Sequence, residues 1–180
     1  NDLSQSDAPP QHFLALAKYF RKKNKRVKIF APFPQRRKNM EEWDMCFYGM
    51  AHKRMRWLYH FFGQLSLFIR LVREPDLKGD TVIYVRSSPA MIIPTLWSLA
   101  TRTKLIVEIN GLILEGPHKW WHLRSLVWII NEFMAVQVAY RVIVVTPNIR
   151  DILIPAYRLK SEKVHAISNG ADVEKFQPQS

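Results

Sequence analysis

Apolar residues recur along the chain with two alternating spacings, one typical of helices and one typical of strands. The helical spacing covers residues 9–24, 54–73, 89–101, 120–140 and 147–157. Short runs rich in Val and Ile lie between or after them, at residues 26–30, 81–85, 104–109, 142–145 and 164–167. Because parallel strands are buried on both faces and are joined by helices, this alternation predicts an α/β domain built on a parallel sheet.

A sheet of this kind normally opens with a strand, but here a helix follows a short polar run. We therefore expect that a first strand precedes Asn1 or has been lost. Residues 1–178 are expected to form one Rossmann-like domain with helices on both faces of the sheet. Residues 35–39 are expected to form a basic loop, and no element is assigned to residues 40–53. The most apolar stretch, 126–145, is interrupted by polar residues and predicts a buried helix followed by a strand, not a membrane span; the interruptions are Asn131, Glu132, Gln137 and Arg141.

The helix predicted over residues 54–73 is amphipathic. Its apolar face carries Leu58, Phe61, Phe62, Leu65, Phe68, Ile69 and Val72. Its other face carries Arg56, His60, Gly63, Ser66, Arg70 and Arg73. Two interpretations fit the pattern: the apolar face packs on the sheet, or it enters a membrane interface whose anionic headgroups attract the cations.

Composition indicates the redox compartment of the protein and the charge of its partner. The 180 residues include a single cysteine, Cys46, which cannot form an internal disulfide, so a reducing, cytoplasmic compartment is the simpler expectation. Cys46 lies in an apolar run and is expected to be a small buried residue, not a nucleophile. The formal net charge of +12 implies an anionic partner, which charge alone does not identify.

Candidate binding residues are those that follow the strands, because ligands of such sheets bind beyond the carboxyl ends of the strands. At three strand ends these residues are Arg86; Glu108, Asn110 and Gly111; and Asn169 and Gly170. Glu108 ends an otherwise apolar strand, where a carboxylate is costly unless it is paired or faces a cleft. It is interpreted either as a site for sugar hydroxyls or as the ion-pair partner of Arg86.

The remaining candidates each have two interpretations. Arg86 binds an anion or forms a structural salt bridge, and His118 is a base, a phosphate donor or a solvated loop residue. The Asn-Gly pairs at 110–111 and 169–170 are ligand contacts or plain turns. Glu115 lies in the loop that also holds His118. No phosphate-binding loop, dinucleotide fingerprint, nucleophile elbow or metal-ligand spacing is present in the sequence.

Two stretches of the sequence resemble glycosyltransferase family 4. Residues 142–148, Val-Ile-Val-Val-Thr-Pro-Asn, precede a short helix, and residues 163–172 and 176–178 fit the patterns K-V-x-x-I-x-N-G-x-D and F-x-P. Earlier, residues 82–87 and 105–115 resemble a subgroup with Y-x-R and E-x-N-G followed by Glu. The resemblance covers about residues 7–178, while 34–55 match no known pattern. The first loop, residues 4–10, lacks the glycines usual in the family.

The resemblance implies a GT-B enzyme of two Rossmann-like domains, of which this chain is the N-terminal, acceptor-side half. The donor-binding domain would then be absent from the chain, and the isolated chain is expected to fold without transferring sugar. The implied reaction is a retaining, metal-independent, hexosyl-type transfer from a nucleotide sugar. It also implies substrate-binding roles for Glu108, Asn110, Gly111 and Glu115, and for Asn169 and Gly170 near the hinge. Catalytic residues stay open between Glu108 and His118.

The resemblance also gives the positive charge a use. The expected acceptor is a lipid-linked or cell-surface glycan in polysaccharide biosynthesis, with the enzyme peripheral on the inner face of the cell membrane. Residues 21–23, 25–26 and 36–38 are basic clusters that would contact anionic headgroups. The rival interpretation is a non-catalytic basic module that binds nucleic acid or carbohydrate. Nucleic acid is not the expected partner, because no known binding module is present and the aromatic residues lie on buried-type faces.

Overall fold

The computed structural model describes residues 8–32, 45–48, 56–74, 81–87, 91–111 and 123–168. The chain divides into two compact units, Asn1–Pro75 and Asp76–Ser180.

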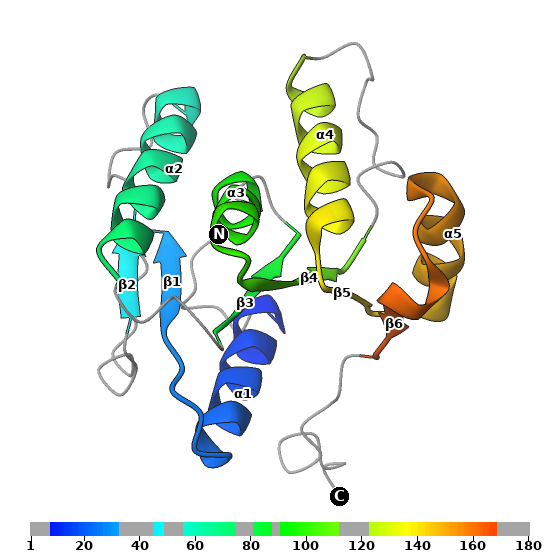
Figure 1. Cartoon of the computed structure of the whole chain (residues 1–180), viewed down its shortest axis with the longest axis horizontal. Coiled ribbons are helices and arrows are strands. Elements are labelled where there is room, and N and C mark those ends of the chain that lie inside the picture. The colour runs from blue at the N-terminus through cyan, green and yellow to red at the C-terminus, as the bar shows by residue number, and fades with distance from the viewer. Residues whose placement is uncertain are drawn as a thin grey trace, which may run out of the picture. The chain divides into compact units, whose positions relative to one another are not determined.

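The first unit contains two short strands and two helices. Helix α1 (Ala8–Lys22) is followed by strands β1 (Ile29–Pro32) and β2 (Met45–Tyr48) and helix α2 (Arg56–Val72), as Figure 1 shows. The two strands are parallel, with Ile29 opposite Met45. Helices α1 and α2 and strand β1 confirm three predicted elements.

Strand β2 was not predicted, and it places two strands in succession where the sequence pattern indicated strict alternation with helices. It lies inside residues 40–53, to which no element was assigned. Periodicity cannot assign a run of four apolar residues, because so short a run fits a buried strand, a helix segment or a loop. Cys46 lies on β2, opposite Phe30. The structure does not describe the exposure of its side chain, so the expectation that Cys46 is buried stays a prediction.

Helix α2 does not bury the face that its pattern indicated. Its buried positions include Gly63, Leu67 and Leu71. Five apolar side chains of the predicted face are instead 39–55% exposed, namely Phe62, Leu65, Phe68, Ile69 and Val72. The helix is apolar around more than half of its circumference, so an amphipathic pattern alone does not identify the side that packs.

The second unit is a four-stranded parallel sheet with helices between its strands. Along the chain β3 (Val82–Arg86), α3 (Ile92–Thr101), β4 (Lys104–Ile109) and α4 (Leu123–Val138) come first. They are followed by β5 (Arg141–Val144), α5 (Pro147–Tyr157), a short 3₁₀ turn (Ser161–Lys163) and β6 (Val164–Ala166). The strands lie in the order β3-β4-β5-β6, and every neighbouring pair is parallel. This is the helix-flanked, Rossmann-like α/β sheet that the sequence predicts.

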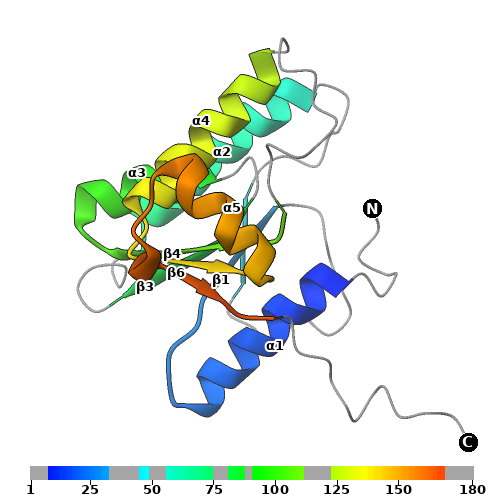
Figure 2. The ribbon, with the colours of Figure 1, turned by 90° about the vertical axis from the view of Figure 1, so that its right-hand side faces the viewer.

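The core of the second unit lies between the sheet and helices α3, α4 and α5, which are on the same side of the sheet (Figure 2). The sequence predicted helices on both faces, whereas the helices that the structure describes in this unit cover one face. The strands lie side by side in chain order, and right-handed crossovers then place every connecting helix on the same side. Side chains alternate between the faces of a strand. Leu105, Val107 and Ile109 therefore share the helix-covered face of β4 and are almost completely buried. Glu108 points to the opposite face, which we call the outer face of the sheet.

Local sequence signals set the bounds of α5. Thr146 is the N-cap, and its side-chain oxygen accepts a hydrogen bond from the Ile149 amide at 3.3 Å. Pro147 occupies the first helical position, where the missing N–H costs nothing. The helix ends at Tyr157, and Arg158 adopts a left-handed conformation with φ of 52°. These signals explain why the first and last residues predicted for this helix agree with the structure.

Candidate functional site

The carboxyl ends of β3 and β4 bring the first predicted site residues together. Arg86 and Glu108 are register partners at the ends of these two strands. The Ser87 amide donates a hydrogen bond of 2.7 Å to the Glu108 carbonyl, which extends the pairing one residue beyond β3. Parallel strands of equal register therefore place Arg86, Ser87 and Glu108 at one edge of the sheet, which we call the β3–β4 edge.

Glu108 is the centre of a cluster on the outer face. Its side chain is buried, with 1% of the residue exposed. Its Oε2 accepts a hydrogen bond from the Tyr84 hydroxyl, and its Oε1 accepts one from Asn110 Nδ2 at 2.8 Å. Arg86 Nε lies 3.7 Å from Oε1, which makes an ion pair with a half-buried guanidinium. The ion pair that the sequence left as one interpretation of Glu108 is thus formed.

The hydroxyl of Tyr84 keeps its proton in this cluster. Burial is the first cause that raises the pKa of Tyr84 above its usual value, and the hydrogen bond to Glu108 and the charge of Glu108 raise it further. The neutral phenol therefore donates to the carboxylate. Tyr84 was not among the predicted site residues, although it shares the outer face with Arg86 two residues later.

Asn110 and Gly111 follow β4 directly. Asn110 is half-buried, and its amide is oriented by Glu108: the NH₂ group donates to the carboxylate, so Oδ1 faces away from it. Gly111 is exposed, its backbone is not left-handed, and a Cβ there would meet no atom within 4 Å. Conformation therefore does not require glycine at this position. Glu115, His118, Asn169 and Gly170 lie outside the described residues.

Helix α4 carries a second buried carboxylate, which the sequence analysis noted only as an interruption of an apolar stretch. Glu132 is fully buried. Its Oε2 accepts a hydrogen bond from Ser87 Oγ at 3.0 Å, and its Oε1 accepts one from the Tyr157 hydroxyl at 2.7 Å. A carboxylate inside an apolar helix is costly unless it is hydrogen-bonded, and that cost was the signal available in the sequence.

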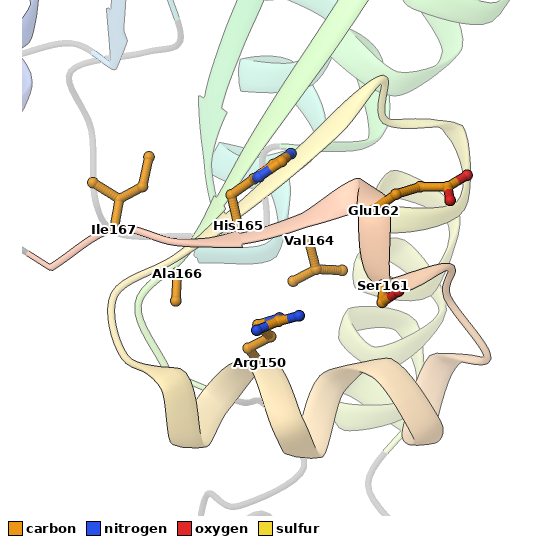
Figure 3. Close-up of a pocket in the computed structure, with 7 residues that line it drawn as sticks. All are labelled: Arg150, Ser161, Glu162, Val164, His165, Ala166 and Ile167. Atoms are coloured by element: carbon orange, nitrogen blue, oxygen red, sulfur yellow. The ribbon is translucent and has the colours of Figure 1, made fainter.

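A separate hollow lies beside β6, the last strand of the sheet (Figure 3). It has a volume of about 570 Å³ and is bordered by α5 and β6. Arg150 reaches toward β6 from α5, and the other lining residues are Ser161, Glu162, Val164, His165, Ala166 and Ile167. None of the predicted site residues that the structure describes lines it. Its lining combines a cation, an acid, a histidine, a serine hydroxyl and apolar groups, and this mixture indicates no single ligand class.

Within the described parts of the chain, no three His, Cys, Asp or Glu side chains gather in a way that could hold a metal ion. None of the helices that the structure describes is long and apolar enough to cross a membrane.

The fold and the polar edge define an α/β domain of the Rossmann-like class, with candidate ligand groups beyond the carboxyl ends of parallel strands. The family model described as Glycosyltransferase Family 4 matches residues 10–175. The chain therefore belongs to glycosyltransferase family 4, as its C-terminal motifs indicated. No curated protein matches the chain.

Proposed function

We propose that this chain is the acceptor side of an enzyme that transfers a sugar from a nucleotide-sugar donor to a glycan or lipid-linked acceptor. Membership of the family supports a glycosyltransferase in general. The observation that carries the finer proposal is the Glu108 cluster at the β3–β4 edge, where a buried carboxylate orients an amide and a guanidinium. Ligands of such sheets bind at this edge.

Within this proposal Glu108 organises the site and does not itself transfer a proton. Its two oxygens already accept hydrogen bonds from Tyr84 and Asn110, and almost none of the side chain is exposed. Arg86 is half-buried, and Asn110 Oδ1 is a buried acceptor that receives no hydrogen bond from the described residues, so we assign the ligand contacts to these two groups. Asn110 Oδ1 would accept a hydrogen bond from an acceptor hydroxyl, and Arg86 would donate to an oxygen of the sugar or of a phosphate.

The proposed reaction retains the anomeric configuration and uses no metal. A bond forms between the acceptor oxygen and the anomeric carbon as the bond to the phosphate oxygen of the donor breaks, and the proton of the acceptor hydroxyl passes to the leaving phosphate. This chemistry requires an acceptor hydroxyl held close to the anomeric carbon and stabilisation of the leaving phosphate. We assign the first task to the β3–β4 edge and the second to a donor-binding domain of a GT-B enzyme. Glu115, His118, Asn169 and Gly170 remain proposed contributors.

The experiment is a transfer assay of the complete protein with a panel of nucleotide sugars and glycan or lipid-linked acceptors. We expect turnover that persists in a chelator, a product of retained configuration by NMR, and no turnover by residues 1–180 alone. Asn110→Ala is expected to raise KM for the acceptor about tenfold, because one buried hydrogen bond to the substrate is lost. Ser98→Ala removes a buried hydrogen bond to the Thr103 carbonyl and is the matched control. An Asn110→Ala enzyme with wild-type KM would contradict the proposed acceptor site.

The proposed location is the cytoplasmic face of a membrane with anionic lipids. The last turns of α1 and the residues after it expose two aromatic rings, Tyr19 and Phe20, among cations. The exposed cations are Lys18, Arg21, Lys22, Lys23, Lys25 and Arg26. Aromatic rings suit the headgroup region, and each cation near an anionic surface contributes about 1 kcal/mol. The exposed apolar side chains of α2 suit the same environment.

Vesicle sedimentation of the complete protein tests this location. Binding to vesicles that contain anionic phospholipid is expected to fall at least about tenfold in Lys22→Glu/Lys23→Glu. The wild-type protein and the variant should both bind weakly to vesicles of zwitterionic phospholipid. Retention of duplex DNA or RNA in a gel at the same salt, without vesicle binding, would favour a nucleic-acid partner and contradict the membrane proposal.

A further inference from the structure

The pair of residues at the end of β3 is attached to two different carboxylates. Arg86 points to the outer face and pairs with Glu108, whereas Ser87 points to the helix-covered face and donates to Glu132. The Ser87 amide also donates to the Glu108 carbonyl. Ser87 is thus held by its backbone to β4 and by its side chain to α4.

Glu132 is in turn anchored to α5. The Tyr157 hydroxyl donates to its second oxygen, and the Tyr157 carbonyl accepts a hydrogen bond of 2.6 Å from Gln137 Nε2, one turn further along α4. Burial, and then the hydrogen bond and charge of Glu132, raise the pKa of Tyr157 above its usual value, so the phenol keeps the proton that it donates. The carboxylate therefore joins the end of β3 to the end of α5 through α4.

Stability alone is a poor explanation for a carboxylate in this position. Burying a charge costs free energy that hydrogen bonds repay only in part, and apolar residues of similar volume often stabilise a fold equally well or better. What a carboxylate adds is direction, because its two oxygens accept from fixed hydroxyls. Here one of these hydroxyls belongs to the first residue after β3, next to Arg86.

We propose that Glu132 is a positioning residue of the β3–β4 edge, which holds Ser87 and thereby the backbone that carries Arg86. The inference rests on the proposed function of that edge. It assigns Glu132 no contact with substrate. Glu132 acts through Ser87, and Tyr157 fixes the orientation of Glu132.

The first test separates positioning from stability. In Glu132→Met/Tyr157→Phe of the complete protein, the buried carboxylate and the phenol hydroxyl that donates to it are both removed, and the side-chain volumes are nearly kept. We expect a thermal midpoint at or near the wild-type value and exchange of the Ser87 amide that is about tenfold faster, because a hydrogen bond to a charged group is lost. Glu132→Gln should restore slow exchange, because the Ser87 hydroxyl can accept from the new amide while Tyr157 still donates to its oxygen.

Ser87→Ala supplies a second, independent variant in case the double variant does not fold. It removes the hydroxyl alone and is expected to show the same faster exchange at residue 87. Ser98→Ala, which removes a buried hydroxyl of the same unit, should leave that exchange unchanged. Unchanged exchange at residue 87 in Ser87→Ala and in the folded double variant would overturn the proposal.

The transfer assay then distinguishes the inference from the function on which it rests. A positioning role predicts a lower kcat/KM in Ser87→Ala and near wild-type values in Glu132→Gln. A loss of transfer without faster exchange at residue 87 would overturn the positioning role. Faster exchange with wild-type transfer would support the inference that Glu132 holds Ser87 and would instead contradict the proposed function of the β3–β4 edge.

Discussion

Glu108 and Glu132 are two buried carboxylates in the same unit, and each accepts a hydrogen bond from a tyrosine hydroxyl. They differ in their remaining partners and in the face of the sheet that they serve. Glu108 lies on the outer face, with a half-buried arginine and a half-buried asparagine beside it. Glu132 lies between the sheet and the helices, where it also accepts a hydrogen bond from the serine hydroxyl at the end of β3.

The difference shows how one chemical group supports two tasks. A carboxylate whose partners reach the surface can orient groups toward a ligand, as we propose for Glu108. A carboxylate on one helix whose partners lie at the end of a strand and on a second helix orients the scaffold, as we infer for Glu132. The two are connected through the consecutive residues Arg86 and Ser87.

The largest expected effect separates the two carboxylates by activity. Glu108→Gln places an amide where Asn110 and Arg86 both donate, so it should lower kcat/KM of the complete protein by about 10- to 100-fold, the range typical of supporting residues. It should fold, as circular dichroism would show. Glu132→Gln should lower kcat/KM by less than about threefold. Equal losses in the two variants would remove the distinction, and wild-type rates in Glu108→Gln would make Glu108 purely structural.

A smaller effect is expected on stability when the cation is removed. Arg86→Ala leaves the buried Glu108 carboxylate without its ion-pair partner at 3.7 Å. We expect the free energy of unfolding to fall by about 1–2 kcal/mol, less than for a fully buried pair because Arg86 is 29% exposed. Urea unfolding measures it, and Arg86→Lys should recover part of the loss. Unchanged stability would show that the pair is not coupled to folding.

Alkaline pH tests the two tyrosines that serve the carboxylates. The folded-state pKa values of Tyr84 and Tyr157 are raised above 10.0, so the native state keeps protons that the unfolded chain releases. Their contribution to stability is complete below about pH 10 and is lost as pH rises beyond it, by up to about 1.4 kcal/mol per pH unit for each tyrosine. Tyr84→Phe and Tyr157→Phe should each flatten this decline in urea titrations. If stability falls with pH as steeply in both variants as in the wild type, groups other than these two tyrosines cause the loss.

The smallest effect is expected at an exposed carboxylate in the same unit. Glu162 pairs with Lys160 at 4.0 Å, and both side chains are more than 70% exposed. Glu162→Gln should change the free energy of unfolding by less than about 0.5 kcal/mol. A larger loss would mean that burial is not what distinguishes Glu108 and Glu132 from an ordinary surface carboxylate.

The sequence predicted the second unit better than the first because its elements carry several independent signals. The α5 helix has an N-cap threonine, a proline at its first position and a preceding strand rich in Val and Ile. The carboxyl-edge rule then placed Arg86 and Glu108 together from strand order alone. Strand β2 has only four apolar residues, and α2 is apolar around too much of its surface, so neither the element nor the buried face followed from the pattern.

The sequence could not rank the two carboxylates. Glu108 was found because it ends a strand, and Tyr84 could have been found because it lies two residues before Arg86 on the same face. Glu132 depends on Ser87 and Tyr157, which are 45 and 25 residues away along the chain. Contacts of that separation require the packing of α4 against the sheet and against α5, which no local spacing encodes.

The most direct test of the account is a crystal structure of the complete protein with a nucleotide sugar and an acceptor that supports transfer. The account predicts an acceptor hydroxyl within about 3.2 Å of Asn110 Oδ1 or of the Arg86 guanidinium, with Glu108 still bonded to Asn110. An acceptor bound elsewhere, with Arg86, Glu108 and Asn110 all remote from both substrates, would contradict it.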